Sequence, residues 1–592
     1  MTEETRSLET GASGMAERAL RRVPAGWTSS RMAVLLVLAA LPTLPMLLSP
    51  AATWTALFQD GYITLDMAWR WMSGQLPGRD YGSPLGIGYA FLLGVSGTLS
   101  GSPAGAALFA PSLFWLAFLP CFAFALRRRT RFSTALWLAI ACAFTVVSPG
   151  HADRSDPFLV HLAPYNAQLS ALLALCLVWG FPSVTRVSSS SIDRTEWLGD
   201  LLVCVWLIYA ATSKATGAVG MALILLASSF CGGPSLRRTA SVIGGALIAT
   251  AVLCLATGTL GGYVSDLLGA VRARGSAADV DGLPGFAKLF RDISENAFGL
   301  FACFVASAAL ASSRIVGARG ASAFCLTSSA ILLAAANQSH VSSVPGFLFL
   351  ALLAVTRLAD VSVSLVPSAT RSRAAAFAFL ASAALLSWSS LTAALAEGTH
   401  VWLSGAAVSG GRDALLVDIP SKGGGESAFV RGYGYAASGA HGRTLAESLS
   451  ADVFPGATMD DARKAGLSIG GRANAEILSD GLDALDRFAP VGSRVATLAF
   501  SNPFPALTGT PSPRGTMLWW HLGRTLGIAP PPNASVLFGD AEVVLEPRSY
   551  FDRRTLDALR EAALPFLSSD FVLAGESGAW RVWLRRETLG VR

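Results

Sequence analysis

Apolar residues form long runs between residues 31 and 395, and short polar segments separate the runs. The first run extends from Met32 to Leu48 and lacks a small-residue cleavage site, so we interpret it as a retained span rather than a signal peptide. The later runs lie near 103–126, 132–148, 166–182, 198–213, 216–231, 239–258, 296–312, 321–336, 345–359 and 373–394. Each run is about long enough to cross the ~30 Å hydrocarbon core of a bilayer. The pattern therefore predicts a mainly α polytopic membrane protein with about 11–13 transmembrane helices.

The segment 84–101 does not fit this simple pattern. It is apolar, but it contains Gly86, Gly88, Gly94, Gly97 and Gly101. A full span here would reverse the orientation of everything that follows it. We interpret it as a partial or re-entrant segment, or as one half of a helical hairpin.

Basic clusters follow alternate runs, and cytoplasmic loops of membrane proteins carry an excess of arginine and lysine. The clusters include Arg127–Arg129, Arg237–Arg238, and Arg314 with Arg319. Placing these clusters inside also places the N-terminal tail, residues 1–30, in the cytoplasm. The loops that then lie outside are 50–84, 149–165 and 259–295. The charge pattern thus predicts a multi-pass membrane protein whose C-terminal segment lies outside. We expect the membrane to be the bacterial inner (plasma) membrane.

The overall composition agrees with this class. Hydrophobic residues make up 52% of the 592 residues and charged residues 14%, whereas soluble domains carry about 25% charged residues. A wholly soluble enzyme and a disordered chain are therefore excluded. The net charge of +6 resides in short loop clusters, so we expect no nucleic-acid partner. The eight cysteines lie in or beside apolar runs without a C-x-x-C spacing, which favours packing over a metal or redox site.

From about residue 396 the pattern changes to short apolar runs between polar segments. Runs at 494–500, 542–545, 571–574 and 580–584 have the length and composition of strands. The segments 473–488 and 553–566 carry apolar residues at helical spacing. Residues 396–592 are therefore predicted to form an extracytoplasmic α/β domain, beside the transmembrane domain 31–395. No phosphate-binding loop, G-x-S-x-G or G-x-G-x-x-G pattern occurs in it.

The loop 50–84 holds the most informative chemistry. Asp60 directly follows the first span, apolar and aromatic residues at 62–72 predict a helix lying along the membrane interface, and Asp80 and Tyr81 follow that helix. A carboxylate at a membrane boundary is costly to desolvate and usually faces protein or a water-filled cavity. The alternative is that both aspartates are solvated loop residues or helix caps.

Lys214 lies in a short turn between two apolar runs, on the side that the charge pattern assigns to the outside. Lysine is rare in this chain, which contains only Lys214, Lys288, Lys422 and Lys464. A compact ammonium at the outer boundary suits a lipid-linked phosphate. The alternative is a lysine that extends its charge towards water from an apolar site.

The order Asp60, Gly74, Pro77, Asp80, Tyr81, Pro84 resembles the first outer loop of the GT-C superfamily of membrane glycosyltransferases. That superfamily includes protein mannosyltransferases, oligosaccharyltransferases and aminoarabinose transferases. The resemblance implies that Asp60 is the catalytic acidic residue. It also implies substrate-binding residues in and after the second outer loop, at Asp153, Asp156, Tyr165 and Asn166, and at Lys214.

The resemblance implies transfer of a sugar from a polyprenyl-phosphate-linked donor to an extracytoplasmic lipid, polysaccharide or protein acceptor. We expect Asp60 to act as the base, with Asp80 and Tyr81 among the substrate-binding groups, membrane lipids as further partners, and no cofactor. Gly61 stands where the family often has a second acidic residue, so nothing supports a metal. Two alternatives stay open, namely an O-antigen ligase or polymerase and a lipid or sugar transporter.

Overall fold

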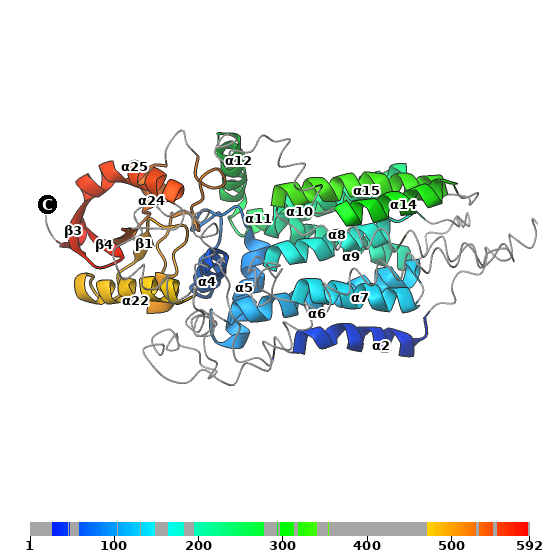
Figure 1. Ribbon diagram of the computed structural model, residues 1–592, viewed down its shortest axis with the longest axis horizontal. Coiled ribbons are helices and arrows are strands. Elements are labelled where there is room, and N and C mark those ends of the chain that lie inside the picture. The colour runs from blue at the N-terminus through cyan, green and yellow to red at the C-terminus, as the bar shows by residue number, and fades with distance from the viewer. Residues whose placement is uncertain are drawn as a thin grey trace, which may run out of the picture.

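The computed structural model describes residues 27–44, 58–103, 105–130, 132–147, 164–182, 194–276, 297–312, 318–339, 471–527, 532–548 and 553–589, with three single positions besides. Within these ranges a bundle of helices occupies one end of the molecule. A small sheet flanked by two helices occupies the other end, with α4 and α12 between them (Figure 1). The predicted boundary near residue 396 and most of the tail 1–30 lie outside the described residues.

The bundle consists of helices that lie side by side over most of their length, except that α5 crosses one end of the bundle beside α4 (Figure 1). They are α2 (Ser29–Ala40), α5 (Ile87–Ser100), α6 (Ala106–Arg129), α7 (Phe132–Val147), α8 (Pro164–Gly180), α9 (Arg194–Ser213), α10 (Ala215–Phe230), α11 (Leu236–Ala256), α14 (Ala297–Ser312) and α15 (Ala318–Ser339). Among the described residues, α6, α9 and α11 contain segments long and apolar enough to cross a membrane, and seven further apolar helices are shorter.

The apolar runs of the sequence predict these helices closely, because helix-forming apolar residues are continuous there. The runs near 345–359 and 373–394 lie outside the described residues, so the total number of spans stays a prediction. The segment 84–101 forms α5, whose 14 residues extend about 21 Å. Other bundle helices are similarly short, with 12 residues in α2 and 16 in α7, so the interpretation of this segment as a partial span stays a prediction.

Aromatic side chains at helical spacing form much of the bundle core. Phe114, Phe118 and Phe122 lie at successive i, i+4 positions of α6 and therefore share one face. The rings of Phe114 and Phe118 lie 5.3 and 5.1 Å from the ring of Trp206 on α9. Trp115 donates its indole N–H to the Ala39 carbonyl at 2.7 Å, which joins α6 to α2.

The C-terminal unit, residues 471–589, contains a four-stranded sheet in the order β1-β2-β4-β3. Its strands are β1 (Val495–Thr497), β2 (Val543–Pro547), β3 (Phe571–Glu576) and β4 (Trp580–Arg585); β1 is parallel to β2 and the other pairs are antiparallel. Its helices are α22 (Gly471–Phe488), α23 (Phe504–Thr508), α24 (Ala534–Leu537) and α25 (Arg553–Asp570). Short 3₁₀ helices, η1 (Leu41–Thr43) and η3 (Arg586–Leu589), complete the described elements.

Helices cover both faces of this sheet. Side chains alternate along a strand, so Val543 and Leu545 pack with α22 whereas Val544 packs with α25. The central strand β2 is buried along its whole length, as its continuous apolar sequence predicts. The predicted strand at 494–500 is shorter in the structure, because the chain leaves the sheet after Thr497.

The helix predicted after Asp60 is α4 (Phe58–Met72). It does not lie free along the membrane interface, since every residue from 61 to 68 is buried. Ile63 and Met67 pack on the bundle helices α5 and α6, while Tyr62 and Leu65 pack in the core of the C-terminal unit. The apolar residues predict the helix correctly. However, they pack against the bundle and against the C-terminal unit, and not against lipid.

Candidate functional site

The loop between α4 and α5 lies in close contact with three other parts of the chain, at three glycines four residues apart. A Cβ on Gly78, which has φ +74°, would lie 2.8 Å from the Thr259 carbonyl oxygen. A Cβ on Gly86 would lie 2.2 Å from the Thr212 carbonyl oxygen, and Gly82 lies against the C-terminal unit. No larger side chain fits at Gly78 or Gly86 without displacing backbone. The loop therefore has a fixed position between α12 (Leu260–Ser276), the end of α9, and the C-terminal unit.

Three residues that the sequence analysis names as substrate-binding come together at the end of α9. The Lys214 Nζ donates to Asn166 Oδ1 at 2.6 Å and lies 4.8 Å from the centre of the Tyr165 ring. Lys214 precedes the first turn of α10, and Tyr165 and Asn166 lie in the first turn of α8. We call Tyr165, Asn166 and Lys214 the Lys214 cluster.

The Lys214 cluster adjoins the first outer loop. The Gly86 N–H donates to the Ser213 carbonyl at 3.2 Å, immediately before Lys214. The Tyr89 ring lies edge-on to the Tyr165 ring, with 5.5 Å between their centres. The turn that carries Lys214 is thus joined to the loop that follows Asp60 by a backbone hydrogen bond and by an aromatic contact.

Asp60 lies in the first turn of α4, and its side chain lies outside the described part of the structure. The relation of its carboxylate to the Lys214 cluster therefore stays a prediction.

Asp80 accepts hydrogen bonds from its own loop. Its Oδ2 accepts from the Leu76 N–H at 2.9 Å and from Arg79 Nη2 at 2.7 Å, and Arg514 Nη1 lies 3.7 Å from its Oδ1. Burial alone would raise the pKa of Asp80, but the hydrogen bonds and positive charges outweigh it and lower that pKa. These contacts support a part for Asp80 in holding the loop, and its contact with substrate stays a prediction.

Tyr81 is buried, and the guanidinium of Arg70 lies 4.7 Å from the centre of its ring. Its hydroxyl has no hydrogen-bond partner among the described residues. Burial raises the pKa of that hydroxyl, so Tyr81 is neutral at ordinary pH. Asp153 and Asp156 lie outside the described residues, and their substrate contacts stay a prediction.

Sequence reasoning treats 259–295 as an outer loop and misses Asp266. The structure shows that residues 260–276 form α12, and Asp266 Oδ2 accepts from the Ser83 N–H at 2.7 Å. Burial raises the pKa of Asp266 to about 6, against the opposing effect of that hydrogen bond. Asp266 therefore joins α12 to the first outer loop through a titratable group. The only signal in the sequence is a lone acidic residue within an amphipathic stretch.

Sequence reasoning also misses a buried ion pair within α4. Asp66 Oδ2 lies 3.0 Å from Arg70 Nε, and the two side chains are 0% and 1% exposed. Burial raises the pKa of Asp66, while the charge of Arg70 and hydrogen bonds from Arg70 and Ser512 oppose the shift. In the sequence, this ion pair is indicated only by an Asp and an Arg four residues apart on a predicted helix. Such pairs are typical of exposed helix faces, so the spacing does not indicate a buried pair.

Metal ligands do not gather in the described part of the chain. None of its His, Cys, Asp and Glu side chains form a group of three or more that could hold a metal ion.

Comparison with known proteins finds similar solved structures. No family model and no curated protein matches the chain. The chain is similar to ArnT from Cupriavidus metallidurans in the apo state, with TM-score 0.40, 13% identity, and 94% of this chain and 97% of that chain covered. It is also similar to ArnT from the same organism bound to undecaprenyl phosphate, with TM-score 0.37, 13% identity and coverage of 95% and 98%.

A third similar structure is the archaeal oligosaccharyltransferase AglB from Archaeoglobus fulgidus, in complex with an inhibitory peptide and a dolichol-phosphate. Its TM-score is 0.39, its identity 11%, and the alignment covers 93% of this chain and 74% of that chain. ArnT and AglB are GT-C glycosyltransferases, the class that the first outer loop resembles.

Proposed function

We propose that this protein is a membrane glycosyltransferase that takes a sugar from a polyprenyl-phosphate donor and transfers it to an extracytoplasmic acceptor. The acceptor class is an envelope lipid, polysaccharide or protein. The observation that carries the proposal is the contact between the Lys214 cluster and the first outer loop, through the Gly86 N–H and the Ser213 carbonyl. It brings a cation suited to a phosphate next to the loop that follows Asp60.

In the proposed reaction Asp60 accepts the proton of the acceptor hydroxyl. The hydroxyl oxygen then forms a bond to the anomeric carbon, and the bond between that carbon and the phosphate oxygen breaks. The bonding electron pair leaves with the polyprenyl phosphate. Attack opposite the leaving group inverts the anomeric carbon.

Lys214 would stabilise the charge that grows on the departing phosphate. An ammonium has three donors, and one of them is directed at Asn166 Oδ1. Asn166 and the Tyr165 ring would orient the ammonium towards the phosphate. Asp153 and Asp156 are proposed to bind the donor or acceptor sugar. Asp80 and Tyr81 are proposed to shape the first outer loop.

The proposal places the protein in the bacterial inner membrane with its C-terminal unit outside. The common location of the candidate site and the C-terminal unit supports this. In Figure 1, α4 and α12 lie between the bundle and the C-terminal unit, and the turn before Lys214 is hydrogen-bonded to the loop after α4. The basic clusters of the sequence, such as Arg237–Arg238, belong to the opposite ends of the bundle helices.

The test is to incubate the purified full-length protein in lipid nanodiscs with a panel of polyprenyl-phosphate sugars and membrane-envelope acceptors. We expect release of free polyprenyl phosphate, with label in an acceptor, for one sugar of the panel. Nucleotide sugars should give no transfer. Transfer from a nucleotide sugar but from no lipid-linked sugar would contradict the proposal.

A further inference from the structure

We propose that Arg70 is a positioning residue that fixes the first outer loop against the C-terminal unit. It would thereby set the place of α4, which carries Asp60, and of the loop around Asp80. The catalytic consequence rests on the proposed function, whereas the docking is a property of the fold alone.

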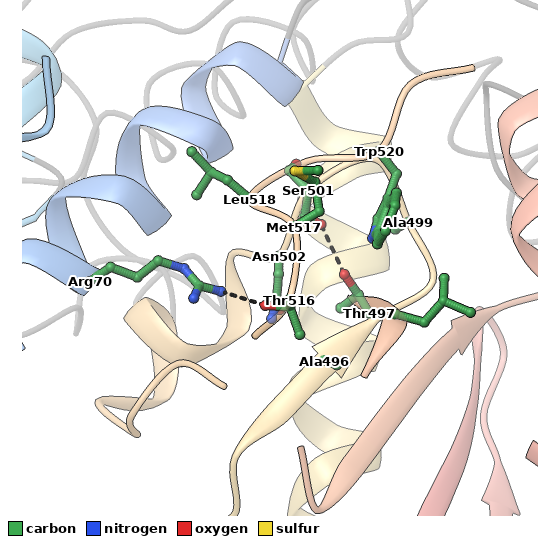
Figure 2. A pocket seen from close by; sticks show the side chains of 11 residues that line it. Arg70, Ala496, Thr497, Ala499, Ser501, Asn502, Thr516, Met517, Leu518 and Trp520 are labelled. Atoms are coloured by element: carbon green, nitrogen blue, oxygen red, sulfur yellow. Dashed lines mark hydrogen bonds between the residues drawn. The ribbon is translucent and has the colours of Figure 1, made fainter. Parts of the chain in front are cut away.

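All three nitrogen atoms of the Arg70 guanidinium donate hydrogen bonds. Its Nε donates to Asp66 at 3.0 Å, its Nη1 donates to the Pro513 carbonyl at 2.8 Å and to Gln75 Oε1 at 3.2 Å, and its Nη2 donates to Thr516 Oγ1 at 3.3 Å. Figure 2 shows the side chain extending from α4 to Thr516, at the edge of a small cavity of the C-terminal unit. One side chain thus joins α4, the following loop and the C-terminal unit.

The chemistry of these contacts is specific to arginine. A planar guanidinium presents donors in a fixed fork, whereas an ammonium is a point charge on a flexible stem. Burying an ion pair costs desolvation, so such a pair adds little net stability, while loss of one partner is strongly destabilising. The four acceptors around Arg70 therefore determine a geometry more than they contribute a large free energy.

The Arg70 contacts are part of a longer docking segment, residues 510–518, which runs along α4 and the loop after it. The Trp69 indole N–H donates to the Thr510 carbonyl at 2.8 Å, and Gln75 Nε2 donates to the Ser512 carbonyl at 2.7 Å. Ser512 Oγ also donates to Asp66 Oδ1 at 3.0 Å. The C-terminal half of α4 is therefore held along its side as well as at Arg70.

Backbone hydrogen bonds continue the docking along the loop. The Gly515 N–H donates to the Asp80 carbonyl at 2.7 Å, the Gly82 N–H to the Thr516 carbonyl at 2.9 Å, and the Leu518 N–H to the Gly82 carbonyl at 2.8 Å. The loop and the docking segment pair like two short parallel strands, with Gly82 opposite Met517. Two segments more than 400 positions apart in sequence are thus joined by backbone hydrogen bonds.

The position of Arg70 explains how it would act on chemistry that it does not touch. Asp60 lies ten residues earlier in the same helix, about 15 Å along the axis. A helix is stiff over that length, so a shift of its C-terminal end moves Asp60 as well. A displacement of about 1 Å in a catalytic group can cost about 100-fold in rate.

The first test is Arg70→Lys, which keeps the charge and removes the fork. We expect kcat for sugar transfer to fall about 10- to 100-fold. The donor KM should stay within about twofold, because none of the four Arg70 hydrogen bonds involves a residue of the Lys214 cluster. The matched control is Arg560→Lys, which alters an equally paired arginine in the C-terminal unit, 2.8 Å from Glu546. Its kcat should equal that of the wild type. An Arg70→Lys kcat within about twofold of the wild type would overturn the proposal.

A second test needs no turnover. Hydrogen exchange of the full-length protein in nanodiscs should show faster exchange at the amides of Gly82, Gly515 and Leu518 in Arg70→Lys, and in Thr516→Val, which removes one of the four bonds. Peptides of α22 should exchange as in the wild type. Unchanged exchange at all three amides would overturn the docking role, whether or not the protein proves to be a glycosyltransferase.

Discussion

The ammonium of Lys214 lies 2.6 Å from Asn166 Oδ1, although 48 residues separate the two in sequence. The same ammonium lies over the Tyr165 ring. An ammonium carries three N–H donors, and these two contacts set where the group lies at the end of α9. This relationship makes the end of α9 the best described candidate for a phosphate site.

Lys214→Ala should raise the KM for the lipid-linked donor at least tenfold, because it removes the charge-assisted hydrogen bonds proposed for the phosphate. Lys214→Arg keeps the charge and should recover part of the loss. Initial rates over a range of donor concentration give both constants. An unchanged donor KM in Lys214→Ala would exclude the phosphate role.

Asn166→Ala should have a smaller effect of the same kind, about three- to tenfold on donor KM, since the ammonium loses an orienting acceptor but keeps its charge. Donor titration checks this as well. The effect should disappear in the Lys214→Ala background, because there the amide has no ammonium to orient. Equal effects of Asn166→Ala in both backgrounds would show that Asn166 acts independently of Lys214.

Gly86→Ala should destabilise the protein and impair transfer, because its Cβ would lie 2.2 Å from the Thr212 carbonyl oxygen. The backbone of α5 or of the Lys214 turn must then shift. The matched control is Gly244→Ala in α11, where a Cβ meets no atom within 4 Å. That control should be neutral or stabilising by about 0.5–1 kcal/mol, as alanine favours a helix over glycine. Thermal unfolding and transfer rates of the two variants decide the point.

The pKa of Asp266 predicts a pH dependence of stability. It is raised from 3.8 to about 6 in the folded protein, so the folded state binds its proton more tightly than the unfolded state does. This group therefore stabilises the fold below about pH 4, and that contribution is lost as pH rises through about 6. The melting temperature of Asp266→Asn minus that of the wild type should therefore increase as pH rises from about 4 to 7, and should be constant above that range.

Asp80 should behave in the opposite sense and provides the control. Its pKa is lowered in the folded state, so its contribution is present at neutral pH and is lost as pH falls. Asp80→Asn should therefore lower the melting temperature at pH 7 and have progressively less effect towards acid pH. Parallel pH profiles for the two variants would contradict the account of this loop.

Much of the fold follows from the sequence because it depends on local pattern. The runs that predict α6 to α11 give helices with nearly those bounds. The short continuous apolar run in 542–545 predicts a buried strand, which the structure contains as β2. The predicted interfacial helix is correct as a helix and wrong in its surroundings. Tyr62 and Leu65 pack against residues more than 400 positions away, and local periodicity carries no information about such partners.

Some residues of the candidate site are likewise predicted from the sequence, and others are not. Lys214 is singled out by its place in a short turn between two apolar runs, and Tyr165 and Asn166 by the family resemblance. The structure brings the three together. Arg70, Asp66 and Asp266 are missed because their role depends on burial by distant segments. An i, i+4 pair looks the same in sequence on an exposed face and inside a domain contact.

The measurement that tests the central claim most directly is single-turnover transfer from a labelled polyprenyl-phosphate sugar by purified Asp60→Asn. Asp483→Asn, the same change at an exposed carboxylate of α22, is the control. The account predicts that Asp60→Asn binds donor as the wild type does and transfers at least about 1000-fold more slowly, since general-base catalysis contributes about 100- to 10,000-fold. Transfer by Asp60→Asn at the rate of Asp483→Asn would contradict it.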